Sequence, residues 1–252
     1  MKIKLSKTSA MHYWKLMFRS ILFITALLIY IVNKVNKRPT LFGRFEKDYF
    51  FLFIIWGIFV VEMCLRFFPS YIESMGCRKQ FRKNYIPTGV GTPIIQTIKV
   101  TILIALGWIG INSIFGVLYL VGVVDWGIML LLSLAYSVCD MICILFFCPF
   151  QTWFMKNKCC GNCRIYNWDY AMMFTPLAFV KGLYTWSILI LAIGLVANWE
   201  LLVARHPERF SEATNAALSC ANCTEKLCSH KKQLQKFLKE NRAMIMHSVN
   251  KE

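Results

Sequence analysis

Residues 100–147 read VTILIALGWIGINSIFGVLYLVGVVDWGIMLLLSLAYSVCDMICILFF, and this stretch decides the fold class. It contains one apolar run over 100–124 and most of a second over 126–149. Each run is long enough to cross a hydrocarbon core of about 30 Å as a helix. Asp125 and Trp126 leave room only for a tight turn between them. The stretch therefore predicts two antiparallel transmembrane helices.

Three further apolar runs cover residues 16–33, 49–68 and 171–203. The first follows a basic start but no small-residue cleavage site comes after it, so we interpret it as an uncleaved span. The last would form a helix of about 50 Å, which exceeds the membrane thickness. Pro176 and Lys181-Gly182 lie in its first half, which favours a kinked or interfacial start and a main crossing near 182–199.

These runs predict an all-α, polytopic helical membrane protein with five transmembrane helices. The transmembrane domain covers 1–203, and a basic, amphipathic, helical tail containing Cys and His covers 204–252. Hydrophobic residues make up 57% of the 252 residues and charged residues only 17%, against roughly 25% in soluble domains. We therefore expect a multi-pass protein of the cell membrane.

The net charge of +16 suggests the lipid bilayer as the partner, and not nucleic acid, because the basic residues flank the apolar runs. Five crossings place the N-terminus and the tail on opposite sides. The side with the N-terminus and the loops 69–99 and 150–170 carries more basic residues near the spans than the other side. This asymmetry predicts that the N-terminus and both loops are cytoplasmic.

Eleven cysteines are many for a chain of this length, and most of those outside the predicted spans form two groups. The first group occupies the loop before residue 170 and contains Cys148, Cys159, Cys160 and Cys163. The second group lies in the tail and contains Cys220, Cys223, Cys228 and His230. Both groups include a C-x-x-C pair, whose spacing lets two thiolates bind one metal ion.

Three interpretations of these cysteines remain open. The first is a zinc ion or an iron–sulfur cluster held by the tail group, with the loop group as a second site and membrane electron transfer to a redox partner protein as its use. The second is a thiol–disulfide oxidoreductase that uses Cys160 and Cys163, because Lys158 and Arg164 nearby favour a thiolate. The third is a non-catalytic transporter or assembly partner with structural cysteines. Five crossings would place the two groups on opposite sides of the membrane, which conflicts with a single site shared by both.

Ionisable residues within predicted spans are functional candidates by default, and four stand out: Glu62, Arg66, Asp140 and Lys181. Glu62 and Arg66 are four residues apart, so we expect a local pair on one helix. Asp140 and Lys181 lie at similar depths on two consecutive spans and are expected to form a buried pair. That pair would either lock the spans together or mark a polar cavity. No nucleophile–base or phosphate-loop motif is visible, so neither a hydrolase nor an ATP-driven pump is favoured.

Overall fold

The structure is a computed structural model. It describes residues 6–36, 45–68, 75–89, 91–95, 98–156, 163–223, 228, 231–233 and 236. Within these residues the protein is helical, and the only extended pairing is an isolated bridge between Pro87 and Asn215. The predicted all-α polytopic membrane class is confirmed, because four of the helices are long and apolar enough to cross a membrane.

These four helices are α1 (Lys7–Val35), α4 (Ile98–Leu120), α5 (Trp126–Leu145) and α7 (Leu183–Arg205). The helix α2 (Phe45–Leu65) lies beside them and has an apolar part from Phe53 to Leu65. Two short helices complete the α-helical set, α3 (Met75–Gln80) and α6 (Asp169–Phe174). Short turns of other helix types are η1 (Arg82–Asn84), η2 (Phe150–Phe154), η4 (Arg164–Trp168), η5 (Thr175–Phe179), η6 (Pro207–Arg209) and η7 (Ala216–Leu218).

The turn 121–125 joins α4 to α5, at the place where the sequence predicts it. The carboxylate of Asp125 accepts a hydrogen bond from the backbone N–H of Ile128 at 3.0 Å, which caps the first turn of α5. The other oxygen of Asp125 accepts a hydrogen bond from the Tyr30 hydroxyl at 2.9 Å. This residue therefore starts α5 and also fixes it against α1.

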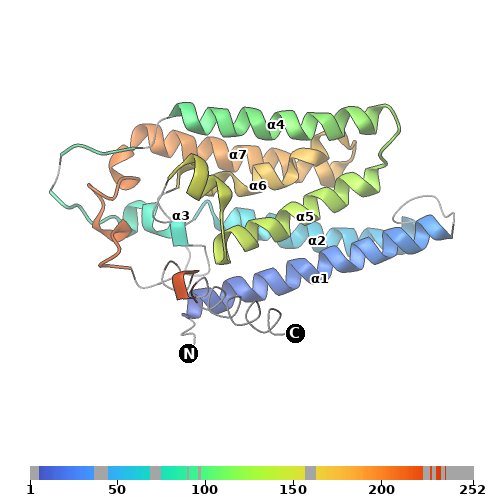
Figure 1. Ribbon diagram of the computed structural model, residues 1–252, viewed down its shortest axis with the longest axis horizontal. Helices are drawn as coiled ribbons and strands as arrows, with labels where there is room; N and C mark the ends of the chain where they lie inside the picture. Colours follow the sequence, from blue (N-terminus) through green and yellow to red (C-terminus); the bar gives the residue numbers. More distant parts are fainter. Residues whose placement is uncertain are drawn as a thin grey trace, which may run out of the picture.

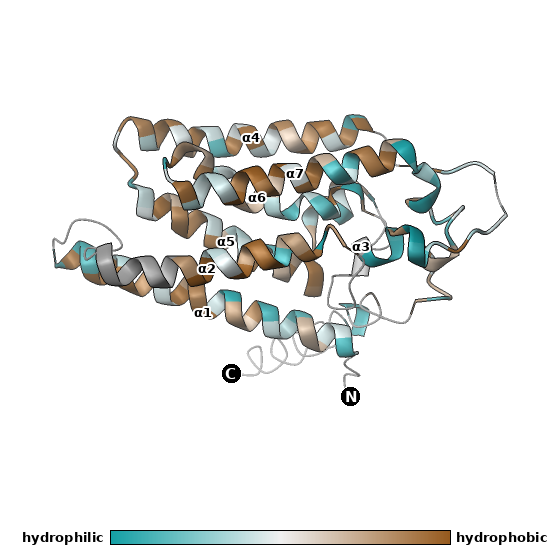
Figure 2. Ribbon diagram, turned by 180° about the vertical axis from the view of Figure 1, so that it is seen from behind, coloured by the Kyte–Doolittle hydropathy of each residue, from teal (hydrophilic) through white to brown (hydrophobic). Residues whose placement is uncertain are grey.

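The helices α1 and α5 run antiparallel along their whole length (Figure 1). Tyr30 meets Asp125 at one end of this pair, and Arg19 meets Asp140 towards the other. We call the end that holds the turn 121–125 the hairpin end. We call the opposite end, which holds Ser6, the end of α2 and the end of α7, the terminal end. Figure 2 shows hydrophilic residues gathered at the terminal end and hydrophobic residues along the helices.

The predicted main crossing near 182–199 is present as α7 (Leu183–Arg205), but the predicted kinked start of the stretch 171–203 is a separate segment that runs in the opposite direction. This segment, α6 with η5, runs beside α4 from the terminal end towards the hairpin end. Two contacts show this direction: the Trp108 indole donates to the Met172 carbonyl at 3.0 Å, and Gly116 lies against the ring of Phe179. The chain then turns, and α7 returns to the terminal end (Figure 1).

The physical reason for this break lies in three residues. Pro176 is in the first turn of η5 and has no backbone N–H to donate. Val180 and Gly182 are both extended, with φ of −93° and 175°. Together they divide what looks like one long apolar helix into two. The bundle thus has six segments between its two ends, and both the N-terminal helix and the residues after α7 lie at the terminal end.

The first part of the tail packs onto the loop between α3 and α4 at the terminal end. The side chain of Asn215 is fully buried; its oxygen accepts from the N–H of Ile86 at 3.3 Å and its nitrogen donates to the carbonyl of Lys79 at 3.1 Å. Residues 206–223 form turns and short 3₁₀ segments here, so the predicted helical tail does not begin directly after α7. Most of the predicted amphipathic helix lies outside the described residues.

The contact between α4 and η5 gives a direct test of this packing. A Cβ atom at Gly116 would overlap the ring of Phe179. We expect Gly116→Ala to destabilise the protein by about 1–3 kcal/mol, as overpacking of a filled contact does. Gly110→Ala is the matched control, because a Cβ there meets open space. Unfolding in detergent measures both, and equal stability of the two variants would contradict the packing.

Candidate functional site

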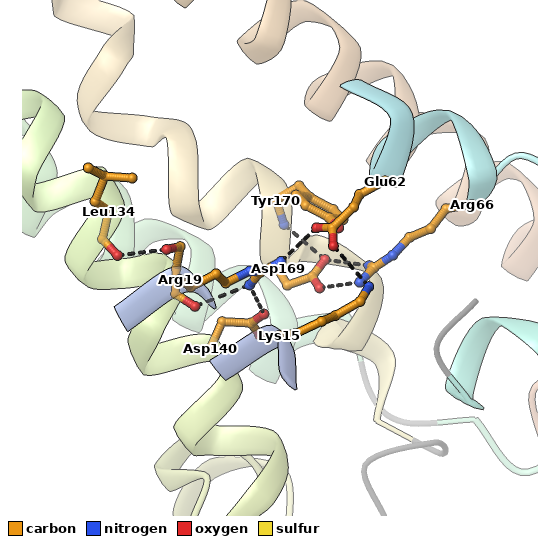
Figure 3. Close-up of polar contacts among 9 residues, drawn as sticks. Lys15, Arg19, Glu62, Arg66, Leu134, Asp140, Asp169 and Tyr170 are labelled. Carbon is orange, nitrogen blue, oxygen red and sulfur yellow. Dashed lines mark hydrogen bonds and ion pairs between the residues drawn. The ribbon is translucent and has the colours of Figure 1, made fainter. Parts of the chain in front are cut away.

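A buried arginine on α1 joins three helices at the terminal half of the bundle (Figure 3). The side chain of Arg19 is only 3% exposed. One terminal nitrogen donates to Glu62 on α2 at 2.9 Å, and the other donates to Asp140 on α5 at 3.1 Å. The second nitrogen also donates to the carbonyl of Ser137 at 3.1 Å. Arg19 therefore ties α1 to α2 and α5 at once.

The same network extends to α6. The hydroxyl of Tyr170 donates to Glu62 at 2.9 Å, and Lys15 pairs with the other oxygen of Glu62 at 3.0 Å. Arg66 binds both oxygens of Asp169 at 2.6 Å each, and its guanidinium lies 4.4 Å from the centre of the Tyr170 ring. Three cations and three anions thus balance one another in this network: Lys15, Arg19, Arg66, Glu62, Asp140 and Asp169.

The observed pairing differs from the predicted one. Glu62 and Arg66 do not pair locally, because each has a partner on another helix. Asp140 pairs with Arg19 and not with Lys181, which is exposed next to α7 at the hairpin end. The cause is the break after η5, which carries Lys181 away from the depth of Asp140. Spacing along one helix identifies only local partners, so these contacts between helices were missed.

Beside this network lies a cavity of about 110 Å³ with an unusual number of sulfur atoms in its wall. Four cysteines line it, two from α5 and two from the loops at the terminal end: Cys139, Cys143, Cys148 and Cys163. Met172 and Met173 add thioether groups, and Asp140 and Asp169 connect the cavity to the network. Of these cysteines, only Cys148 and Cys163 were predicted as site residues. Cys139 and Cys143 fall within the predicted span 126–149, where a cysteine in an apolar run resembles a small hydrophobic packing residue.

Cys143 and Cys148 line the same cavity, and Cys148 lies beyond the end of α5. Hydrogen bonding from the Cys143 thiol is the largest factor that lowers the pKa of Cys148. This hydrogen bond, with that from the backbone N–H of Gln151 at 3.4 Å and the charge of Lys231, lowers the pKa of Cys148 to about 6 despite burial. Cys148 is therefore mainly a thiolate at neutral pH.

The predicted ligands from the tail lie at the same end as this cavity. Cys220 is exposed, and the sulfur of Cys223 accepts a hydrogen bond from Lys79 at 3.5 Å. Cys228 comes three residues before Lys231, whose ammonium donates to the carbonyl of Cys143 at 2.7 Å. The two cysteine groups, which five simple crossings would separate, therefore lie at the same end of the bundle.

Three of the predicted ligands lie outside the described residues: Cys159, Cys160 and His230. Of the expected Cys160–Cys163 pair, only Cys163 is among the described residues. It is buried and directly precedes η4. Among the described residues, no group of three or more Cys, His, Asp or Glu side chains is arranged to hold a metal ion. The geometry at hand is that of a thiol site.

Comparison with protein-family models, curated proteins and solved structures gives no match to this chain. The fold and the site define a class: a polytopic helical membrane protein with a sulfur-lined cavity beside a buried ion-pair network. The function must be argued from the geometry of that site.

The pair between Arg66 and Asp169 gives the first prediction for this site. Both side chains are less than 10% exposed, at 4% and 8%. We expect Asp169→Asn to cost about 3–5 kcal/mol, because it leaves a buried guanidinium without its counter-charge. Lys34→Gln is the control, since Lys34 is exposed where it pairs with Asp125. Thermal unfolding in detergent compares them, and an Asp169→Asn protein as stable as wild type would contradict the role of the pair.

The lowered pKa of Cys148 gives a second prediction. Because only the thiolate reacts, alkylation of Cys148 by iodoacetamide should reach half its maximal rate near pH 6, where an ordinary thiol does so near pH 8.5. Lys231→Met should shift the midpoint upwards, because it removes a cation that stabilises the thiolate. Lys232→Met is the control at an exposed neighbour. Mass spectrometry of the Cys148 peptide measures the rate, and a midpoint near pH 8.5 would refute the assignment.

Proposed function

We propose that this protein is a membrane thiol–disulfide redox protein whose reactive dithiol is Cys143 and Cys148. The observation that carries the proposal is that Cys143 and Cys148 line one cavity, where Cys143 is the main factor that lowers the pKa of Cys148. A dithiol in which one thiol is a thiolate at neutral pH is the arrangement found in redox-active cysteine pairs. The pair replaces Cys160 and Cys163 as the primary candidate.

The exchange reaction follows from the positions of the two sulfurs. The Cys148 thiolate attacks one sulfur of a substrate disulfide, forms a mixed disulfide and releases the first substrate thiolate. The proton of Cys143 passes to that leaving group. The Cys143 thiolate then attacks the sulfur of Cys148 and releases the second substrate thiolate, which takes a proton from water. The products are two substrate thiols and a Cys143–Cys148 disulfide, and the reverse sequence reduces the protein.

The distribution of charge supports a cytoplasmic terminal end in the cell membrane. The described basic residues at the hairpin end are Lys34, Lys47 and Lys181, and the other described lysines and arginines belong to segments in the terminal half. Positively charged loops remain on the cytoplasmic side. Disulfides in the cytosol are usually transient and catalytic, which suits a working dithiol better than a structural one. The basic terminal end also suits anionic lipid headgroups and a cytosolic redox partner.

A second function is supported by a different observation, the convergence of both cysteine groups at the terminal end. Lys79 contacts Cys223, and Lys231 contacts the backbone of Cys143. This convergence would allow a shared zinc ion or iron–sulfur cluster. Its ligands would come from the tail and the loop: Cys220, Cys223, Cys228, His230, Cys148 and Cys159.

Trapping the mixed disulfide tests the first function. Wild-type protein treated with 2-hydroxyethyl disulfide should form a reversible Cys143–Cys148 disulfide, which peptide mass spectrometry detects. Cys143→Ser should instead accumulate a mixed disulfide on Cys148, because the resolving thiol is missing. Cys148→Ser should form neither product, and Cys64→Ser, at an exposed cysteine of α2, should behave as wild type.

Failure to form the Cys143–Cys148 disulfide in any redox buffer would overturn the dithiol proposal. Wild-type protein that contains stoichiometric zinc, or iron with visible absorption, would support the second function instead if Cys148→Ser loses that metal. Metal content is therefore measured on the same preparations before oxidation.

A further inference from the structure

The sulfur-lined cavity extends from the terminal end into the depth of the bundle that the membrane surrounds. The helices α4 and α5 diverge from the turn 121–125 towards this end, and both contribute to its wall (Figure 1). Cys139 in that wall lies six residues before the end of α5, or about 9 Å along the helix axis. A second, more polar cavity of about 340 Å³ lies at the terminal end, and Cys163 is in the wall of both. The sulfur-lined cavity is thus the one that reaches the hydrocarbon region.

This cavity also reaches the outer surface of the bundle. Cys139 is exposed although it belongs to a helix that is apolar enough to cross a membrane, so its outer side faces lipid and not water. Because the same residue lines the cavity, a ligand can enter there sideways from the bilayer. Ions and soluble peptides do not take this route, since polar groups are costly in hydrocarbon.

The space inside the cavity matches a single ring. Four ring-bearing side chains line it: Trp108, Tyr136, Phe150 and Tyr166. The ring centre of Trp108 lies 4.6 Å from that of Tyr136 and 6.1 Å from that of Phe150. The volume of about 110 Å³ is close to that of an apolar protein cavity of about 150 Å³ that takes up benzene. A flat six-membered ring therefore fits among these aromatic groups, which contact such rings through their faces and edges.

One carboxylate oxygen in the wall can accept a hydrogen bond from a ligand. Oδ2 of Asp140 accepts from Arg19 at 3.1 Å, and Oδ1 accepts no hydrogen bond among the described residues. The Asp140 side chain is 16% exposed, so it is not sealed off from a small molecule. A hydroxyl group on a bound ring would donate to Oδ1.

We propose that the sulfur-lined cavity binds the ring of a membrane quinone, which accepts the electrons of Cys143 and Cys148. A dithiol that cycles needs a second redox partner besides its substrate, and both cysteines lie in the wall of this cavity. Quinones are lipid-soluble six-membered rings that carry two electrons. These properties match the entry at Cys139, the ring-sized space and the two-electron oxidation of the pair. This inference rests on the proposed redox function and names the electron acceptor of that site.

The electron transfer is balanced. The Cys148 thiolate and the Cys143 thiol lose two electrons as their S–S bond forms, and Cys143 releases its proton. The quinone takes up the two electrons, this proton and a second proton from water, and becomes a quinol. One quinol hydroxyl donates to Oδ1 of Asp140. The Cys143–Cys148 disulfide then oxidises two substrate thiols by the reverse of the exchange described above.

Protection of Cys148 from alkylation tests the site without electron transfer. The protein is full-length Cys143→Ser in detergent, which cannot form the Cys143–Cys148 disulfide, and the probe is decylubiquinone. We expect the quinone to slow the reaction of Cys148 with iodoacetamide saturably and at least tenfold. The reaction of Cys220, which is exposed in the tail, should not change. Decanol has a chain of the same length but no ring, and it should give no protection.

Two matched substitutions in the same protein test whether the quinone enters at Cys139. Cys139→Phe fills the opening towards lipid and should raise the half-protecting quinone concentration at least tenfold. Cys64→Phe is the control at an exposed cysteine of α2 outside the cavity, and it should leave protection unchanged. Thermal unfolding checks that both variants are folded. Absence of protection, equal protection by decanol, or unchanged protection in folded Cys139→Phe would overturn the site.

Electron transfer is tested separately with wild-type protein in the absence of oxygen. Decylubiquinone should yield one quinol for each Cys143–Cys148 disulfide, and Cys143→Ser should yield no quinol. If 2-hydroxyethyl disulfide oxidises the pair but the quinone does not, the inference is wrong and the proposed function stands. If neither reagent forms the disulfide, the proposed function fails, whereas protection of Cys148 still supports the quinone site.

Discussion

The burial of Arg19 is the constraint on which the rest of this structure depends. A guanidinium that is taken out of water must find counter-charges, since an unpaired buried charge costs several kcal/mol. Arg19 finds them on α2 and α5, through Glu62 and Asp140. Glu62 in turn accepts from Tyr170, and Asp169 next to it holds Arg66. One buried charge thus fixes the relative depth of four helices.

The short segment α6–η5 contributes residues to both the ion-pair network and the sulfur-lined cavity. Asp169 and Tyr170, at its start, belong to the ion-pair network, and Met172 and Met173 line the sulfur-lined cavity. This segment runs from the terminal end to the hairpin end. The following helix, α7, therefore starts at the hairpin end and finishes at the terminal end. That end therefore holds the loop cysteines, the tail and both cavities. Cys163 lies in the wall of both cavities.

Length and composition predict the class of fold and the positions of α1, α4 and α5, because a long apolar run is a local property of the sequence. They predict the turn at Asp125 for the same reason. The partners of Glu62 and Asp140 depend on which helices are neighbours, which no local pattern encodes. The signal for the broken segment was present in Pro176 and Gly182, but it was interpreted as a kink. Cys143 was missed as a candidate because a cysteine in an apolar run is indistinguishable from a packing residue until the fold places it in one cavity with Cys148.

The side of the membrane on which the tail lies tests this account most directly. A membrane-impermeant maleimide is applied to right-side-out and inside-out vesicles, and mass spectrometry follows two thiols, native Cys220 in the tail and Ser6→Cys before α1. Both positions lie at the terminal end, and Cys220 is exposed. The account predicts that both are labelled only in inside-out vesicles. Labelling of the two from opposite sides would restore an odd number of crossings and contradict the structure of the α6–η5 segment.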